Sequence, residues 1–250
     1  MPAHDIIDNR NEKLVHHINR ILSSTESARF AVGYFFLSGL SAIAEELNGV
    51  KELRLLIGNT TNRETLEQLA EGYRRLELVA ETVDAERYPK RTETKRMATE
   101  TAENIRTSME LMDQTDDGEM LVKTLVRLIE DKKLKVKVYT KGRLHAKAYI
   151  FDYGKVFDES GKPVERHEKG IAVVGSSNLT LSGVTHNTEL NVIVQGNSNH
   201  TELVRWFDDL WDESQDFDET LMQEMRESWA YAFMRPYDIY MKTIYALVKD

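Results

Sequence analysis

Short apolar runs of strand length alternate along this chain with segments whose apolar residues recur at helical spacing. Length and apolar patterning predict strands at residues 28–36, 52–57, 134–140, 144–151, 170–174 and 189–195. Helical periodicity predicts helices at residues 8–24, 38–47, 61–76, 121–129 and 198–250. Because strands and helices bury their apolar sides against another layer, this alternation predicts a layered α/β fold.

The length of 250 residues and a hydrophobic content of 41% suit a single domain over residues 1–250. Within it, residues 81–113 are highly charged, which predicts an exposed helical excursion. Turn-forming residues predict a hairpin insertion within residues 153–169. The C-terminal helices at residues 198–250 reach Asp250 without a cap, so we expect the chain to be part of a longer protein.

The composition limits the compartment and the kinds of site. No apolar run approaches the roughly 20 residues that span a bilayer, and the N-terminus lacks a secretory signal. The chain has no cysteine, which excludes disulfides and thiolate metal sites. We therefore predict a cytoplasmic protein without a membrane partner. Six histidines lack metal-ligand spacing and are expected at the surface: His4, His16, His17, His167, His186 and His200.

Polar residues cluster where three of the predicted strands begin or end. His145 and Lys147 alternate with apolar residues, so on a strand they would share one face. A glycine turn, Gly-Ser-Ser-Asn at residues 175–178, follows the next strand, and Glu189 begins the strand after it. This spacing favours one polar site built from separate strands.

The residue types suit the chemistry of a phosphodiester. His145 is a competent nucleophile because imidazole titrates near neutral pH, and a phosphohistidine would divide one difficult displacement into two easier steps. Lys147 supplies a point charge for phosphoryl oxygens. Ser176 and Asn178 offer neutral donors where charge develops, and Glu189 could accept a hydrogen bond from a histidine ring nitrogen. This chemistry needs no metal and no cofactor.

The same residues resemble the HKD motif of the phospholipase D superfamily, here as His145, Lys147, Asp152, Gly175, Ser176 and Asn178. Residues 30–36, 55–58 and 187–189 are also similar to the PLD-like nuclease modules placed N-terminal to bacterial superfamily-two helicases of defence and restriction systems. The resemblance covers roughly residues 8–250. It implies a phospholipase D-like fold, a mixed central sheet flanked by helices with one HKD motif per chain.

The resemblance also implies roles for these residues. The histidine is the nucleophile, lysine and asparagine bind phosphate, and a histidine from a second motif protonates the leaving group. This sequence has one such motif, so resemblance to single-motif nucleases implies a homodimer with a shared active site. The 22 residues between Asp152 and Gly175 exceed the family spacing. The predicted hairpin explains the excess, and we assign Asp152 and Gly175 an orienting or structural role.

Charge is unevenly distributed along the chain. The net charge of −9 argues mildly against a polyanionic partner. However, residues 132–147 hold seven basic residues and no acid, whereas residues 206–225 hold eight acids and no base. One interpretation is a nucleic-acid approach surface, and the alternative is two solvated faces. The residues predicted to bind nucleic acid are Lys135, Lys137, Lys141 and Arg143.

The sequence therefore predicts a metal-independent phosphodiesterase, an endonuclease that cleaves DNA through a phosphohistidine. RNA is an alternative substrate, and a helicase motor in the same full-length chain is an expected partner. A different hypothesis is a catalytically weak module that binds nucleic acid and dimerises for a helicase. A phospholipase is disfavoured because no amphipathic membrane-docking segment is evident.

Overall fold

The computed structural model describes residues 5–35, 37–58, 97–99, 101–103, 105–106, 109, 116–164, 166–231, 240 and 244. The helix predicted at residues 61–76 lies outside the described residues, as do residues 1–4, most of the predicted excursion and nearly all of residues 232–250.

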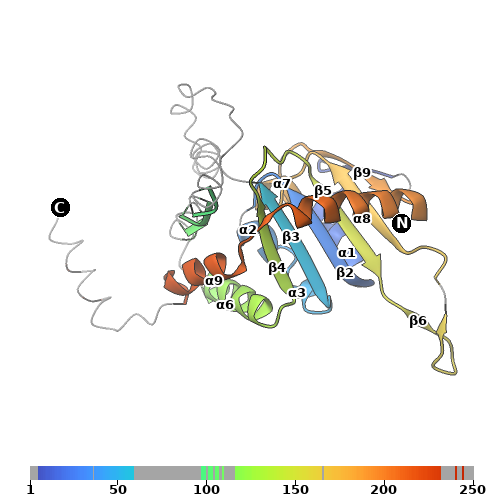
Figure 1. Ribbon diagram of the computed structural model, residues 1–250, viewed down its shortest axis with the longest axis horizontal. Helices are drawn as coiled ribbons and strands as arrows, with labels where there is room; N and C mark the ends of the chain where they lie inside the picture. Colours follow the sequence, from blue (N-terminus) through green and yellow to red (C-terminus); the bar gives the residue numbers. More distant parts are fainter. Residues whose placement is uncertain are drawn as a thin grey trace.

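One eight-stranded mixed sheet forms the centre of the described fold (Figure 1). Its order is β1-β9-β8-β5-β2-β3-β4-β10. Strands β2, β3 and β4 run parallel, and every other neighbouring pair is antiparallel. The predicted mixed α/β fold is therefore confirmed. The strands are β1 (Ile6–Asp8), β2 (Thr25–Val32), β3 (Glu52–Gly58), β4 (Leu134–Tyr139), β5 (Ala148–Tyr153), β8 (Gly170–Gly175), β9 (Leu190–Val194) and β10 (Gln215–Asp216).

Helices cover the sheet on both sides, and alternate strand residues enter two different cores. Phe30 belongs to the larger core, which receives residues from six helices, whereas its neighbour Ala31 packs beneath α8 with Phe207 and Trp211. In Figure 1, α8 crosses the face of the sheet opposite α1. The helices are α1 (Leu14–Leu22), α2 (Leu37–Ser41), α3 (Ala44–Leu47), α6 (Asp116–Glu130), α7 (Leu181–Thr185), α8 (Asn197–Asp212) and α9 (Asp218–Glu227).

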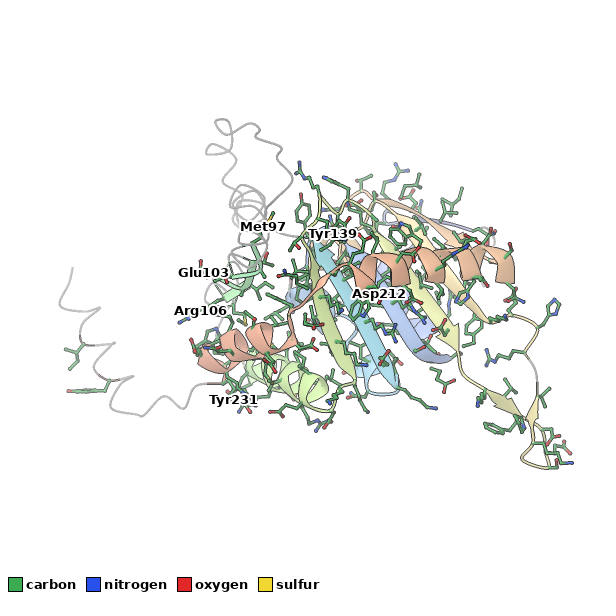
Figure 2. The ribbon with its side chains drawn as sticks, in the orientation of Figure 1. Met97, Glu103, Arg106, Tyr139, Asp212 and Tyr231 are labelled. Carbon is green, nitrogen blue, oxygen red and sulfur yellow. The ribbon has the colours of Figure 1, made fainter. Side chains whose placement is uncertain are left out.

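The described residues of the predicted excursion are helical, but part of them is buried. Ala102, Ile105 and Met109 have exposed fractions of at most 4% and join the larger core. Their spacing places them on one helical face, so a few apolar residues suffice to dock a charged segment. Arg106 lies beside α9 and pairs with Glu227 at 3.1 Å (Figure 2). The prediction of an exposed segment was wrong for these residues.

The strand predicted at residues 144–151 begins only at Ala148. In the neighbouring strand β2, Ala31 pairs with Ala148, and β2 ends one residue later at Val32. The residues before Ala148 therefore lie beyond the ladder that joins β5 to β2. His145 and Lys147 therefore precede the strand in an irregular segment at residues 140–147. The prediction that they share a strand face was wrong.

Between β5 and β8, β6 (Val156–Phe157) and β7 (Pro163–Val164) form a separate two-stranded hairpin. It extends away from the sheet in Figure 1. The hairpin follows Tyr153, the last residue of β5, and thus leaves the sheet at the end opposite Ala148. The long spacing between Asp152 and Gly175 consequently inserts nothing beside His145.

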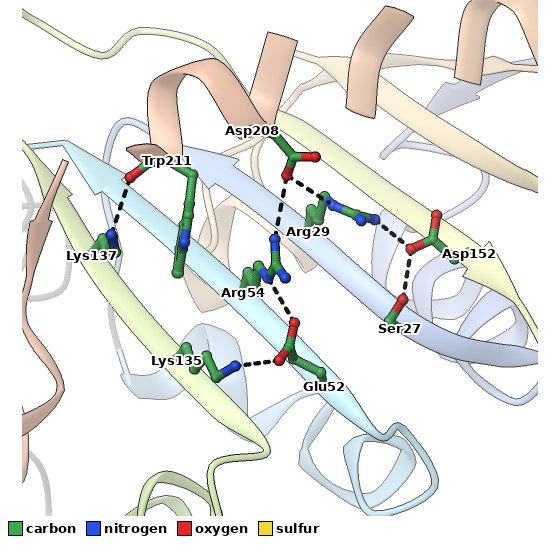
Figure 3. Close-up of polar contacts among 9 residues, drawn as sticks. All are labelled: Ser27, Arg29, Glu52, Arg54, Lys135, Lys137, Asp152, Asp208 and Trp211. Carbon is green, nitrogen blue, oxygen red and sulfur yellow. Dashed lines mark hydrogen bonds and ion pairs between the residues drawn. The ribbon is translucent and has the colours of Figure 1, made fainter. Parts of the chain in front are cut away.

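A chain of ion pairs joins α8 to the sheet (Figure 3). Arg29 on β2 pairs with Asp152 on β5 and lies 3.4 Å from Asp208 on α8. Asp208 also lies 3.4 Å from Arg54, which pairs with Glu52 at 2.6 Å. These pairs hold α8 at one angle across β2 and β3.

A buried histidine extends this network. His200 on α8 has an exposed fraction of 5%, and its Nε2 lies 3.1 Å from Asp152 Oδ1. His17 on α1 is equally buried, at 3%, and contacts Glu12 at 2.8 Å. The prediction that these two histidines lie at the surface was wrong, because each has a polar partner that offsets the cost of burial.

Asp152 is ionised within this network. Burial by itself would raise the pKa of its carboxyl, but hydrogen bonds from His200, Ser27 and Arg29 outweigh burial and lower the pKa to about 2. A folded-state pKa below the unfolded value means that the ionised carboxylate stabilises the fold.

We therefore expect Asp152→Asn to lower the free energy of unfolding near pH 7 by about 1–2 kcal/mol, because the side chain is partly exposed to screening solvent. Stabilisation by Asp152 is fully present above the unfolded pKa of about 4 and is lost as pH falls towards 2. Urea unfolding at pH 7 and pH 3 measures the difference, which should shrink at pH 3. Asp209→Asn, an exposed site on the same helix, is the control; an equal loss in both variants would contradict a role for the network.

Candidate active site

The first half of the candidate site lies in the irregular segment between β4 and β5. His145 is exposed and Lys147 is half-buried. Lys147 Nζ donates to the His145 carbonyl at 2.8 Å, so the ammonium group turns back over the histidine backbone. The carbonyl of Lys147 accepts from the N–H of Gly175 at 3.1 Å. This bond joins the segment to the end of β8, where the second half begins.

The second half is the turn after β8, which leads into α7. Ser176 is exposed, and its hydroxyl donates to the carboxylate of Glu189 while accepting from the N–H of Leu190 at 3.1 Å. The single hydroxyl proton of Ser176 is thus directed at Glu189. Both residues lie at the site, but Glu189 contacts a serine here. The predicted roles of Ser176 as a phosphate donor and Glu189 as a histidine partner stay predictions.

Asn178 is oriented by the backbone after β2. Its Oδ1 accepts from the N–H of Tyr34 at 3.0 Å, and the next residues, Phe35 and Leu179, form a parallel bridge. Because the oxygen is assigned to Tyr34, the Nδ2 group is the one presented as a donor. An amide N–H group is a donor that a phosphate oxygen can accept from.

Gly33 marks the place where the two halves meet. A Cβ atom on Gly33 would lie 3.4 Å from Asn178 Oδ1 and 3.7 Å from Lys147 Nζ. It would also lie 2.8 Å from the carbonyl oxygen of Leu144, closer than real Cβ atoms approach. Gly33 is therefore a point of close approach, where Lys147 Nζ, Asn178 Oδ1 and the Leu144 backbone come together and a larger residue would not fit.

The sequence analysis missed Gly33 and the N–H of Tyr34. Both act through the backbone, and a backbone contact leaves no residue-type pattern in the chain. The available signal was a glycine directly after an apolar strand, which often marks close approach of another backbone. Gly33 and Tyr34 directly follow β2, and their position beside Lys147 was not predictable because β2 lies next to β5 only in the folded sheet.

Most of the predicted nucleic-acid-binding cations have acidic partners. Lys135 pairs with Glu52 at 2.5 Å. Two others pair with the acidic segment at residues 206–225: Lys137 with Asp216 and Lys141 with Glu213, each at 3.3 Å. Segregated charges in the sequence are thus neighbours in space. Arg143, the fourth predicted cation, is exposed two residues before His145. A role for the four in binding nucleic acid stays a prediction.

The arrangement brings the Lys147 ammonium group and the Asn178 amide together at Gly33, and Lys147 also bonds the backbone of His145. Such a set suits a tetrahedral anion. In the described part of the chain, no group of three or more His, Asp or Glu side chains could hold a metal ion. None of the helices that the structure describes combines the length and apolar character needed to span a bilayer.

One family model matches most of the chain. The family model described as "Cardiolipin synthase, PLD-like domain" matches residues 17–211. A search of curated proteins found no match. Similar solved structures include Nuc, a phospholipase D family member from Salmonella typhimurium, with 13% identity, coverage of 84% of this chain and 95% of that chain, and a TM-score of 0.41.

Two further structures give comparable values. NucT from Helicobacter pylori has 12% identity, coverage of 85% of this chain and 97% of that chain, and a TM-score of 0.42. The phosphatidylserine synthase of Haemophilus influenzae has 12% identity, coverage of 93% and 42%, and a TM-score of 0.44.

Gly175 gives a test of the turn geometry. A Cβ atom there would lie closer than 3.0 Å to atoms of Leu190 and Asn191, and two of these atoms belong to the backbone. We expect Gly175→Ala to lower the free energy of unfolding by about 1–3 kcal/mol, as overpacking does. Gly142→Ala is the matched control, because its nearest neighbour is a Tyr139 ring atom at 3.8 Å. Chemical denaturation compares them; equal stabilities would show that the turn relaxes without cost.

Proposed function

Because the chain belongs to the PLD-like domain family, we propose that it hydrolyses phosphodiester bonds without a metal, with His145 as the nucleophile. The observation that carries the proposal is the convergence of Lys147 and Asn178 at the close approach of backbones at Gly33, where Lys147 Nζ also bonds the His145 carbonyl. A phosphoryl group bound beside these two side chains would contact the Lys147 cation and the Asn178 Nδ2 donor while the imidazole of His145 approaches phosphorus.

The proposed reaction has two steps. A ring nitrogen of His145 attacks phosphorus, a P–N bond forms, and the bond to the leaving-group oxygen breaks as that oxygen gains a proton. Water then attacks phosphorus, the P–N bond breaks, and His145 is regenerated with release of the phosphate product. Lys147 and Asn178 stabilise the charge on the non-bridging oxygens in both transition states.

We propose DNA as the substrate, by resemblance of residues 30–36 and 187–189 to helicase-linked nuclease modules. A helicase motor as the partner and a role in defence are proposed on the same ground. Arg143 is exposed two residues before His145, and we propose that Arg143 and Lys147 face the DNA backbone near the nucleophile. A small number of phosphate contacts predicts a shallow dependence of affinity on salt.

We propose further that two copies of the chain share the site, since one motif supplies one histidine. An apolar strip supports this. Ile6, Leu190 and Val192 have exposed fractions of 48%, 59% and 42% and lie on neighbouring strands at the β1–β9 edge. The strip begins at Leu190, whose backbone N–H bonds Ser176, so it adjoins the half-site. Burying it against itself around a two-fold axis would bring two half-sites together.

The nucleophile is tested by His145→Ala. We expect kcat for bis(p-nitrophenyl) phosphate and for DNA, both measured in EDTA, to fall roughly a thousandfold or more. His16→Ala removes another exposed histidine and should retain full activity. Equal activity of wild type and His145→Ala would refute the proposal, and hydrolysis of phosphatidylcholine in place of DNA would move the substrate to lipids.

The shared site is tested by the double variant Leu190→Glu/Val192→Glu. Charges at the centre of an apolar interface oppose association, so light scattering should report a monomer and kcat should fall with it. Val156→Glu/Phe157→Glu places the same charges on the distant hairpin, where exposed fractions are 39% and 58%. That control should keep the dimer. A wild-type monomer with full activity would exclude a shared site.

A further inference from the structure

Ser177 lies between the two turn residues assigned to the site, and it points the opposite way from them. Its exposed fraction is 0%, whereas Ser176 is exposed and Asn178 is half-buried. A serine buried in this position must satisfy a hydroxyl, an N–H and a carbonyl without solvent. The bonds of these three groups fix the conformation of the turn, and so the positions of Ser176 and Asn178.

Two buried side chains bond all three groups of Ser177. The Nδ2 of Asn191 donates to Ser177 Oγ at 2.9 Å, and Asn191 Oδ1 accepts from the Ser177 N–H at 3.4 Å. The hydroxyl of Tyr149 donates to the Ser177 carbonyl at 2.9 Å. Both Asn191 and Tyr149 have exposed fractions of 0%. We call this arrangement of Tyr149, Ser177 and Asn191 the Ser177 clamp.

The Ser177 clamp is rigid because its two outer members belong to strands. Tyr149 is paired with Phe30 on β2 and Val173 on β8, and its ring packs edge-on against Phe30 with centroids 5.0 Å apart. Asn191 is on β9, and a Cβ atom on Gly175 would collide with its Oδ1. The glycine of the motif thus makes the room in which Asn191 reaches Ser177.

The clamp also connects the two halves of the site. Tyr149 lies on β5, two residues after Lys147. Its hydroxyl donates to the carbonyl of Ser177, which lies between Ser176 and Asn178. Burial raises the pKa of the Tyr149 hydroxyl, and the nearby Glu189 carboxylate raises it further. The neutral, donating form of the Tyr149 hydroxyl is therefore favoured.

We propose that Tyr149 and Asn191 are positioning residues, which hold Ser177 so that Asn178 stays aligned with Lys147 at the phosphoryl position. This inference rests on the proposed function. Neither side chain reaches the reacting atoms, so each acts through the turn. Removing one clamp bond should let the turn shift, and small misplacements of a catalytic group reduce rate strongly.

The first readout does not depend on catalysis. In Tyr149→Phe, which keeps the ring packing and removes the hydroxyl, amide hydrogen exchange at residues 176–178 should become roughly tenfold faster. Val136→Ala, a buried change on β4, is the control for general loss of stability and should leave these amides unchanged. Ser177→Ala loses only the Oγ bond to Asn191 and should show a smaller effect of the same sign. Unchanged exchange in Tyr149→Phe would overturn the inference.

The second readout is kinetic. Tyr149→Phe should lower kcat roughly 10- to 100-fold with a smaller rise in KM, while Val136→Ala retains kcat. In an Asn178→Ala background, Tyr149→Phe should reduce kcat less than about twofold further, because both act through one group. Additive losses would overturn the inference. Absence of phosphodiesterase activity in wild type would instead refute the proposed function, and amide exchange would still decide the clamp.

Discussion

The antiparallel pairing of β5 with β8 is the constraint on which the candidate site depends. Its register pairs Ala148 with Val174, so the segment before β5 and the turn after β8 lie at the same end of these two strands. Residues distant in sequence become neighbours there, and the bond from Gly175 to the Lys147 carbonyl extends the ladder into the site. The hairpin between β5 and β8 leaves from the opposite end of these strands, so its length does not affect the geometry of the site.

Strand β2 completes the site from the other side of β5. β2 ends at Val32, so Gly33 and Tyr34 lie beyond the end of the strand. Gly33 lies beside Lys147 and Asn178, and the N–H of Tyr34 bonds Asn178. The chain after β2 therefore supplies a glycine that permits this close approach and a backbone N–H that orients Asn178, whereas the motif supplies the charged and amide groups. Backbone groups held by a sheet lose little further entropy when a ligand binds, which suits a preorganised anion site.

The ion pairs between α8 and the sheet stabilise the fold. The row from Glu52 through Arg54, Asp208 and Arg29 to Asp152 is closed at one end by His200. Asp216 and Glu213, which follow α8, pair with Lys137 of β4 and with Lys141. Pairs of this kind lose stability when one partner is removed, because the other charge remains partly buried. Asp152, the third residue of the resembling motif, belongs to this network at the far end of β5, away from His145.

The sequence by itself determined the fold class, six of the eight sheet strands and the residue types of the site, because local periodicity and motif spacing are properties of the chain. Strands β1 and β10, with three and two residues, are too short to carry a periodic signal. Tertiary structure alone decided that β5 begins after Lys147, that Lys137 and Lys141 meet carboxylates, and that His200 is buried. It also decided that Tyr149 and Asn191 hold Ser177. These contacts depend on which strands become neighbours, and the pairing of two distant segments cannot be predicted from either segment alone.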